Sequence, residues 1–134
     1  MGQISRNEFG SIVVNDQVLT NMIIDEMLDM SDSIILCNKK GKIIKHKPTP
    51  FIEPDYHDAV IITDTIKENS IKLYVIVVFG KSISSVADEL FERIGAIYDS
   101  LLHKKPDVVK FRVRGMKTAA GVVKREIEVQ HSYE

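Results

Sequence analysis

Residues 71–87, with the sequence IKLYVIVVFGKSISSVA, contain a strand, a sharp turn and the start of a helix. Apolar side chains occupy the odd positions from residue 71 to residue 79, and Tyr74, Ile76 and Val78 occupy the opposite face. A strand that is apolar on both faces belongs near the centre of a sheet. Gly80 allows the chain to leave the strand sharply, and Ser82 or Ser84 can cap the helix that follows. This stretch therefore predicts a central strand that leads directly into a helix.

Two helices are predicted from apolar residues spaced three and four positions apart. The longer one covers residues 83–103, about 31 Å of helix, and ends before Pro106. The shorter one covers residues 18–30 and makes about four turns. Both carry charged side chains on the face opposite their apolar stripe, as surface helices do.

The remaining segments predict strands and loops. Gly41 closes a hairpin between residues 33–38 and 42–47, and three prolines make residues 48–57 an extended loop. We expect further strands over residues 9–14, 58–64 and 109–114, the last closed by Gly115. Residues 123–129 can form an edge strand or a loose tail. The expected fold class is α+β, with two helices packed on one face of a mixed β-sheet of about five strands.

Length and composition describe an ordinary globular chain. It has 134 residues, of which 44% are hydrophobic and 28% are charged, and its net charge is −1. We expect one α+β domain over residues 1–117 and a C-terminal extension over residues 118–134. The near-neutral charge exerts no global pull toward nucleic acid or membrane. The single cysteine, Cys37, and the polar N-terminus predict a cytoplasmic protein without a signal peptide or a transmembrane segment.

Residues 9–117 resemble the alkaline shock protein family, the bacterial envelope stress response proteins. The matching stretches are residues 10–14 (GSIVV), 75–87 (VIVVFGKSISSVA) and 109–116 (VKFRVRGM). The signature residues in them have structural roles: Gly10, Gly80, Ser82, Val86, Ala87 and Gly115. The resemblance implies a non-enzymatic protein of cell-envelope homeostasis. It further implies a cytosolic scaffold that forms homo-oligomers or binds a protein partner, which can be anchored in the membrane.

Two clusters of basic residues are candidates for partner binding. The hairpin carries Lys39, Lys40, Lys42, Lys45 and Lys47, and the strand at 109–114 carries Lys110, Arg112 and Arg114. If both clusters fall on one face, they can bind an acidic protein, phospholipid headgroups or nucleic acid. The simpler interpretation is a solvated hairpin tip and a solvated strand face. A nucleic-acid-binding module is the alternative function, and a small-ligand regulatory domain with a pocket near the proline loop is a third.

Catalytic and metal-binding motifs are weak throughout the sequence. No Gly-x-x-Gly clamp or phosphate-binding glycine loop occurs, and the four histidines are scattered. Residues 55–58 (DYHD) could hold a divalent ion or a catalytic base, but exposed loop polarity explains them as well. Cys37 sits in an apolar run and is predicted to be buried. We therefore expect no enzyme, no cofactor and no metal ion.

Overall fold

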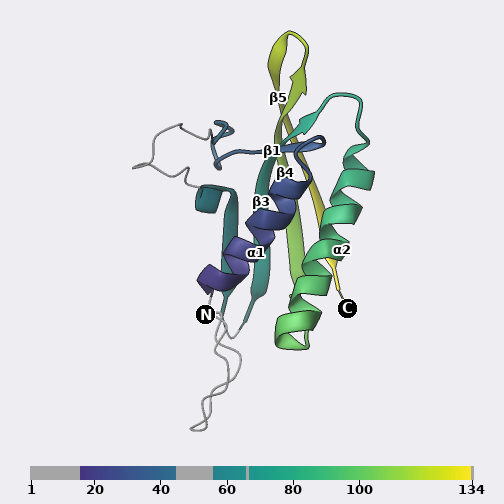
Figure 1. Ribbon diagram of the computed structural model, residues 1–134. Helices are drawn as coiled ribbons and strands as arrows, with labels where there is room; N and C mark the ends of the chain where they lie inside the picture. The colour runs from purple at the N-terminus through teal and green to yellow at the C-terminus, as the bar shows by residue number, and fades with distance from the viewer. Residues whose placement is uncertain (1–15, 45–55, 66, 134) are drawn as a thin grey trace, which may run out of the picture.

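The computed structural model describes residues 16–44, 56–65 and 67–133 (Figure 1). The predicted α+β class is confirmed, and these residues form two α-helices and a mixed five-stranded sheet. The predicted strand at 9–14, Gly10, the three prolines and the hairpin residues Lys45 and Lys47 lie outside the described residues. The elements in chain order are α1 (Asp16–Asp29), β1 (Ile34–Leu36), the 3₁₀-helix η1 (Tyr56–Ala59), β2 (Val60–Asp64), β3 (Asn69–Val78), α2 (Ile83–Leu102), β4 (Val108–Thr118) and β5 (Gly121–Ser132).

β3 is the centre of the sheet, as its sequence predicts. On one side it pairs in parallel with β4, and β5 follows antiparallel to β4 at the outer edge. On the other side, β1 pairs with Val75–Val77 and β2 pairs with Asn69–Leu73, both antiparallel. The two short strands therefore follow one another along the same edge of β3. A parallel pair requires a crossover, and α2 provides it between β3 and β4.

Both helices cover the same face of the sheet (Figure 1). The odd-numbered residues of β3 from Ile71 to Val77, together with Val109, Phe111 and Val113 of β4, are buried against them. Leu90 and Ile94 of α2 are 0% exposed, which confirms the predicted apolar stripe. The helices are also joined by Arg93 of α2, whose Nη1 lies 2.8 Å from Asp29 Oδ2 and 3.2 Å from Glu26 Oε1 of α1.

The turn between β3 and α2 follows the sequence prediction closely. Gly80 has a φ of +94°, in the region that favours glycine. Ser82 is the N-cap of α2, and its side-chain oxygen accepts a hydrogen bond from the Ser85 amide at 3.3 Å. The helix ends at Leu102, and His103 is a left-handed C-cap with a φ of +55°.

Two predicted strand boundaries were wrong. Gly115 does not close β4, because the strand continues to Thr118, with an irregular register between Val113 and Gly115 toward both β3 and β5. A Cβ added to Gly115 would lie 3.0 Å from Val122 Cγ1 and 3.2 Å from the carbonyl oxygen of Val123, so glycine lets β5 approach here. β2 begins at Val60 rather than at residue 58, because the chain first makes the turn η1.

The segment after residue 120, for which the sequence left two alternatives, forms a strand. β5 contains 12 residues and pairs with β4 along most of its length. Its Ile127 and Val129 pack against the main core, while the opposite side chains are polar. A long β4–β5 hairpin thus extends one end of the sheet (Figure 1).

Candidate interaction surface

The sheet face opposite the helices carries the basic strand residues. On β3 this face presents Lys72, Tyr74 and Ile76, and on β4 it presents Lys110 and Arg112. The parallel register places Lys72 beside Lys110 and Tyr74 beside Arg112. Because α1 and α2 both pack on the other face, no described helix covers these side chains. We call this side of the sheet, together with the hairpin described next, the basic face.

The hairpin that follows β1 lies on the same face. Its tip is held by Asn38, whose side-chain oxygen accepts hydrogen bonds from the amides of Lys40 at 2.9 Å and Lys42 at 3.0 Å. A Cβ added to Gly41 would lie 3.4 Å from the Cβ of Arg114, so the tip rests against β4. Beneath the hairpin, a second small core is formed by Cys37, Tyr74 and Ile76. The described lysines of the hairpin, Lys39, Lys40 and Lys42, therefore share one face with Lys110, Arg112 and Arg114 of β4.

Among the described residues, ion pairs neutralise the two arginines of the basic face but none of its lysines. Arg112 Nε lies 2.6 Å from Glu128 Oε1, and Arg114 Nη1 lies 3.2 Å from Glu126 Oε1. The hydrogen bond that Arg112 donates to Glu128 is the main cause that raises the pKa of Arg112. Lysines without an ion pair among the described residues remain on this face: Lys39, Lys40, Lys42, Lys72 and Lys110. The free positive charge of the basic face thus comes from lysine.

Arg114 is more buried than Arg112, whose side chain is 40% exposed. The side chain of Arg114 is 24% exposed, and its Nε is buried without a hydrogen-bond partner among the described residues. Nearby, burial raises the pKa of the Cys37 thiol to about 11, and the charge of Arg114 offsets only part of that rise. The thiol is therefore protonated at neutral pH, which does not suit a nucleophile.

Of the DYHD candidate at residues 55–58, Asp55 lies outside the described residues. His57 and Asp58 are exposed on η1, and with Lys39 and Lys40 they line a hollow of about 320 Å³ beside the hairpin. Ser82 and Ser84 contact each other at 3.2 Å at the start of α2. Within the described ranges, no three His, Cys, Asp or Glu side chains are grouped so that they could hold a metal ion.

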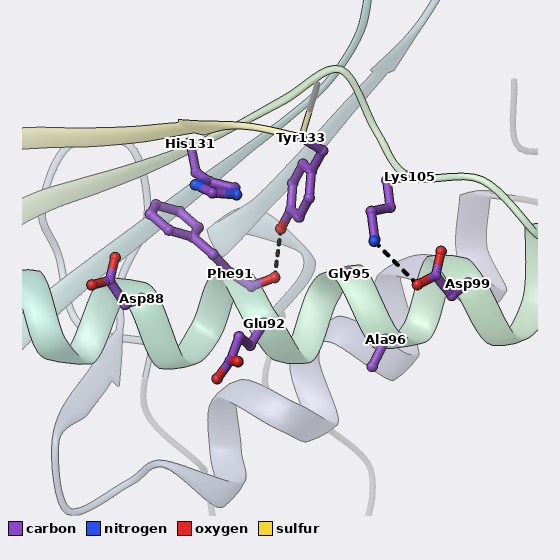
Figure 2. A pocket seen from close by; sticks show the side chains of 9 residues that line it. All are labelled: Asp88, Phe91, Glu92, Gly95, Ala96, Asp99, Lys105, His131 and Tyr133. Atoms are coloured by element: carbon purple, nitrogen blue, oxygen red, sulfur yellow. Dashed lines mark hydrogen bonds and ion pairs between the residues drawn. The ribbon is translucent and has the colours of Figure 1, made fainter.

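A larger groove between α2 and β5 was missed by the sequence analysis (Figure 2). It has a volume of about 560 Å³, and aromatic rings form part of its lining. The ring of His131 stacks on Phe91 at 5.2 Å between centroids, and the Tyr133 hydroxyl donates to the Phe91 carbonyl oxygen at 2.5 Å. The alternation of Ile127, Val129, His131 and Tyr133 was the signal that could have placed these rings on one face.

Comparisons with known proteins give no relative. No family model matches the chain, and neither a curated protein nor a solved structure matches it. In the part of the chain that the structure describes, none of the helices is long and apolar enough to cross a membrane.

Proposed function

We propose that the protein is a non-enzymatic interaction module whose basic face binds an acidic segment of a protein partner. The observation that carries this proposal is the approach of Gly41 to Arg114, which joins the hairpin lysines and the strand lysines on one face. Exposed like charges gathered on one surface attract an oppositely charged partner and speed its association. The net charge of the whole chain is only −1, so this attraction is local.

The chemistry of the face favours a protein partner over nucleic acid. Tyr74 is the one aromatic residue that the described strands place on this face, and it is only 5% exposed, so it offers no ring for base stacking. Glu126 and Glu128 lie among the basic residues and would repel a continuous row of phosphates. A protein partner can match such a mixed pattern of charges residue by residue.

The cellular role that we propose follows from the resemblance of residues 9–117 to the envelope stress response proteins. In this role the protein is a cytoplasmic scaffold of cell-envelope homeostasis that needs no cofactor. It reaches the membrane, where it does so, through a partner protein.

Self-association is the second part of the proposal. Phe79 is 68% exposed and Val123 is 58% exposed, so both large apolar side chains are open to a partner. The Phe79 amide donates to the Lys117 carbonyl oxygen at 2.8 Å, so Phe79 lies near the turn of the β4–β5 hairpin. Light scattering at micromolar concentration should detect oligomers, and Phe79→Ser should reduce their mass. A strict monomer at these concentrations would remove self-association from the proposal.

Three anionic probes test the identity of the partner. Labelled glutamate-rich peptide, single-stranded oligonucleotide and anionic lipid vesicles are each titrated with the protein while the salt concentration is varied. We expect the peptide to bind, and to bind more weakly as salt rises, because exposed charges are screened. Tight oligonucleotide binding with a steep log–log salt dependence would replace the proposal with a nucleic-acid-binding function. Binding to vesicles but not to the peptide would replace it with direct membrane binding.

A further inference from the structure

β5 has a free edge next to the groove that it forms with α2. It is the last strand of the sheet order, and only β4 pairs with it among the described residues. The Tyr133 amide donates to the Asp107 carbonyl oxygen, so the peptide groups of residue 133 face β4. In an antiparallel ladder this direction alternates. The peptide groups of Glu128, Gln130 and Ser132 therefore face outward, where a further strand can pair.

The groove beside this edge has two walls and can receive a side chain of a bound peptide. α2 forms one wall and the end of β5 forms the other, with the rings of Phe91, His131 and Tyr133 between them (Figure 2). Gly95 faces this space, and a Cβ there would lie only 3.1 Å from Tyr133 Cε2. The absence of a side chain at Gly95 thus makes room for Tyr133 in the groove.

The charge of the groove is acidic, opposite to that of the basic face. Asp88 and Glu92 of α2 are exposed along its wall, and neither has an ion-pair partner among the described residues. Asp99 is already engaged, because Lys105 Nζ lies 3.3 Å from its Oδ2. Aromatic faces beside free carboxylates suit lysine and arginine, whose long apolar stems pack on rings while the cation meets the acid.

We propose that the edge of β5 and the groove together bind an extended peptide segment of a partner protein that carries lysine or arginine at alternate positions. The peptide backbone pairs with the outward groups of β5, and every second side chain enters the groove. The wall from Asp88 to Asp99 is about 16 Å long, and alternate strand side chains are about 7 Å apart. The wall therefore accommodates about two side chains of the peptide. This site does not depend on the basic face and stands even if that face binds nothing.

Peptide binding to the whole chain tests the proposal. The probe is a labelled synthetic peptide that alternates lysine and threonine, and its comparator has glutamate in place of every lysine. Fluorescence anisotropy should show saturable binding of the lysine peptide. The glutamate peptide can bind the basic face, so the two sites are told apart by which amides each peptide shifts. In a ¹⁵N spectrum, the lysine peptide should shift the amides of residues 88–99 and 127–133 most.

Two pairs of variants separate edge pairing from charge. Gln130→Pro removes an N–H group that faces outward, and an edge strand tolerates proline at such a position. Gln130→Thr, which keeps this N–H group, is the control. The double variant Asp88→Lys with Glu92→Lys, the groove reversal, reverses the charge of the groove wall. Its control, Asp25→Lys with Glu68→Lys, changes the net charge by the same amount at exposed acids elsewhere. We expect affinity to fall at least about tenfold in Gln130→Pro and in the groove reversal, and to stay within about twofold in both controls.

Three results would overturn the proposal. They are a glutamate peptide that shifts the amides of residues 88–99 and 127–133 as strongly as the lysine peptide does, unchanged affinity of the lysine peptide in the groove reversal, and shifts by the lysine peptide confined to the basic face. Unchanged affinity of the lysine peptide for a folded Gln130→Pro variant would overturn the part of the proposal that concerns edge pairing. If circular dichroism shows that Gln130→Pro does not fold, the groove reversal and the shift map decide.

Discussion

Gly41 of the hairpin lies against Arg114 of β4, with only 3.4 Å between the Arg114 Cβ and a Cβ added to the glycine. The φ of Gly41 is +86°, a conformation that glycine adopts without strain. This contact lays the hairpin on the sheet, covers Cys37, Tyr74 and Ile76, and brings Lys40 and Lys42 to the same side as Lys72 and Lys110. The basic face thus exists because of tertiary packing around one glycine.

Leu90 tests the helix layer. Its side chain is 0% exposed between α2 and the sheet, so Leu90→Ala should lower the free energy of unfolding by about 2–5 kcal/mol. Leu28→Ala on α1, where the side chain is 37% exposed, is the control and should cost clearly less. Urea unfolding measures both. A loss below about 0.5 kcal/mol at Leu90 would contradict its burial against the sheet.

Gly115 tests the close approach of β4 and β5. Gly115→Ala should destabilise the protein by about 1–3 kcal/mol, because its Cβ would press on Val122 and on the backbone of Val123. Adding Val122→Ala should recover part of this loss. Gly80→Ala is the matched control, since its added Cβ meets nothing within 4 Å and its cost comes from the positive φ. Val122→Ala should not rescue Gly80→Ala.

We expect substitutions at Gly95 and Tyr133 to have coupled effects on stability, with a sign that follows from their contact. Alanine in a helix interior is favoured over glycine by about 1 kcal/mol. The Tyr133 ring, 3.1 Å from the added Cβ, opposes this gain in the wild-type protein. Gly95→Ala should therefore stabilise the Tyr133→Ala variant more than it stabilises the wild type. Equal effects in both backgrounds, measured by urea unfolding, would show that the two residues do not touch.

The sequence predicted the elements whose pattern is local. The two-sided apolar run of β3 and the periodic stripe of α2 needed only neighbouring residues, and both are present as expected. The irregular register at Gly115 could not be predicted, because it depends on how β5 pairs with β4. The neutralisation of Arg112 likewise depends on the register that sets Glu128 opposite it. Lys39, Lys40, Lys42 and Lys110 were candidates from the sequence, whereas Lys72, the acids among these lysines and the groove of His131 and Tyr133 were not.

Cys37 gives stability a pH dependence with a definite sign. Burial raises the pKa of its thiol from 9.0 to about 11, so the folded state keeps a proton that the unfolded state releases in this range. The contribution of the thiol to stability is fully present below pH 9.0 and is lost as the pH rises toward about 11. Cys37→Ala should flatten this part of the stability profile. Parallel profiles for the variant and the wild type would contradict the buried, neutral thiol.

The most direct test of the basic face is the affinity of a glutamate-rich peptide for two double variants of equal charge. Lys40→Glu with Lys42→Glu reverses the charge of the hairpin. Lys67→Glu with Lys104→Glu reverses the charge of two exposed lysines outside the basic face. We predict that the hairpin reversal weakens binding at least about tenfold, and that the control stays within about twofold of the wild type. Equal affinities in the two double variants would contradict the account, because the hairpin would then be only a solvated tip.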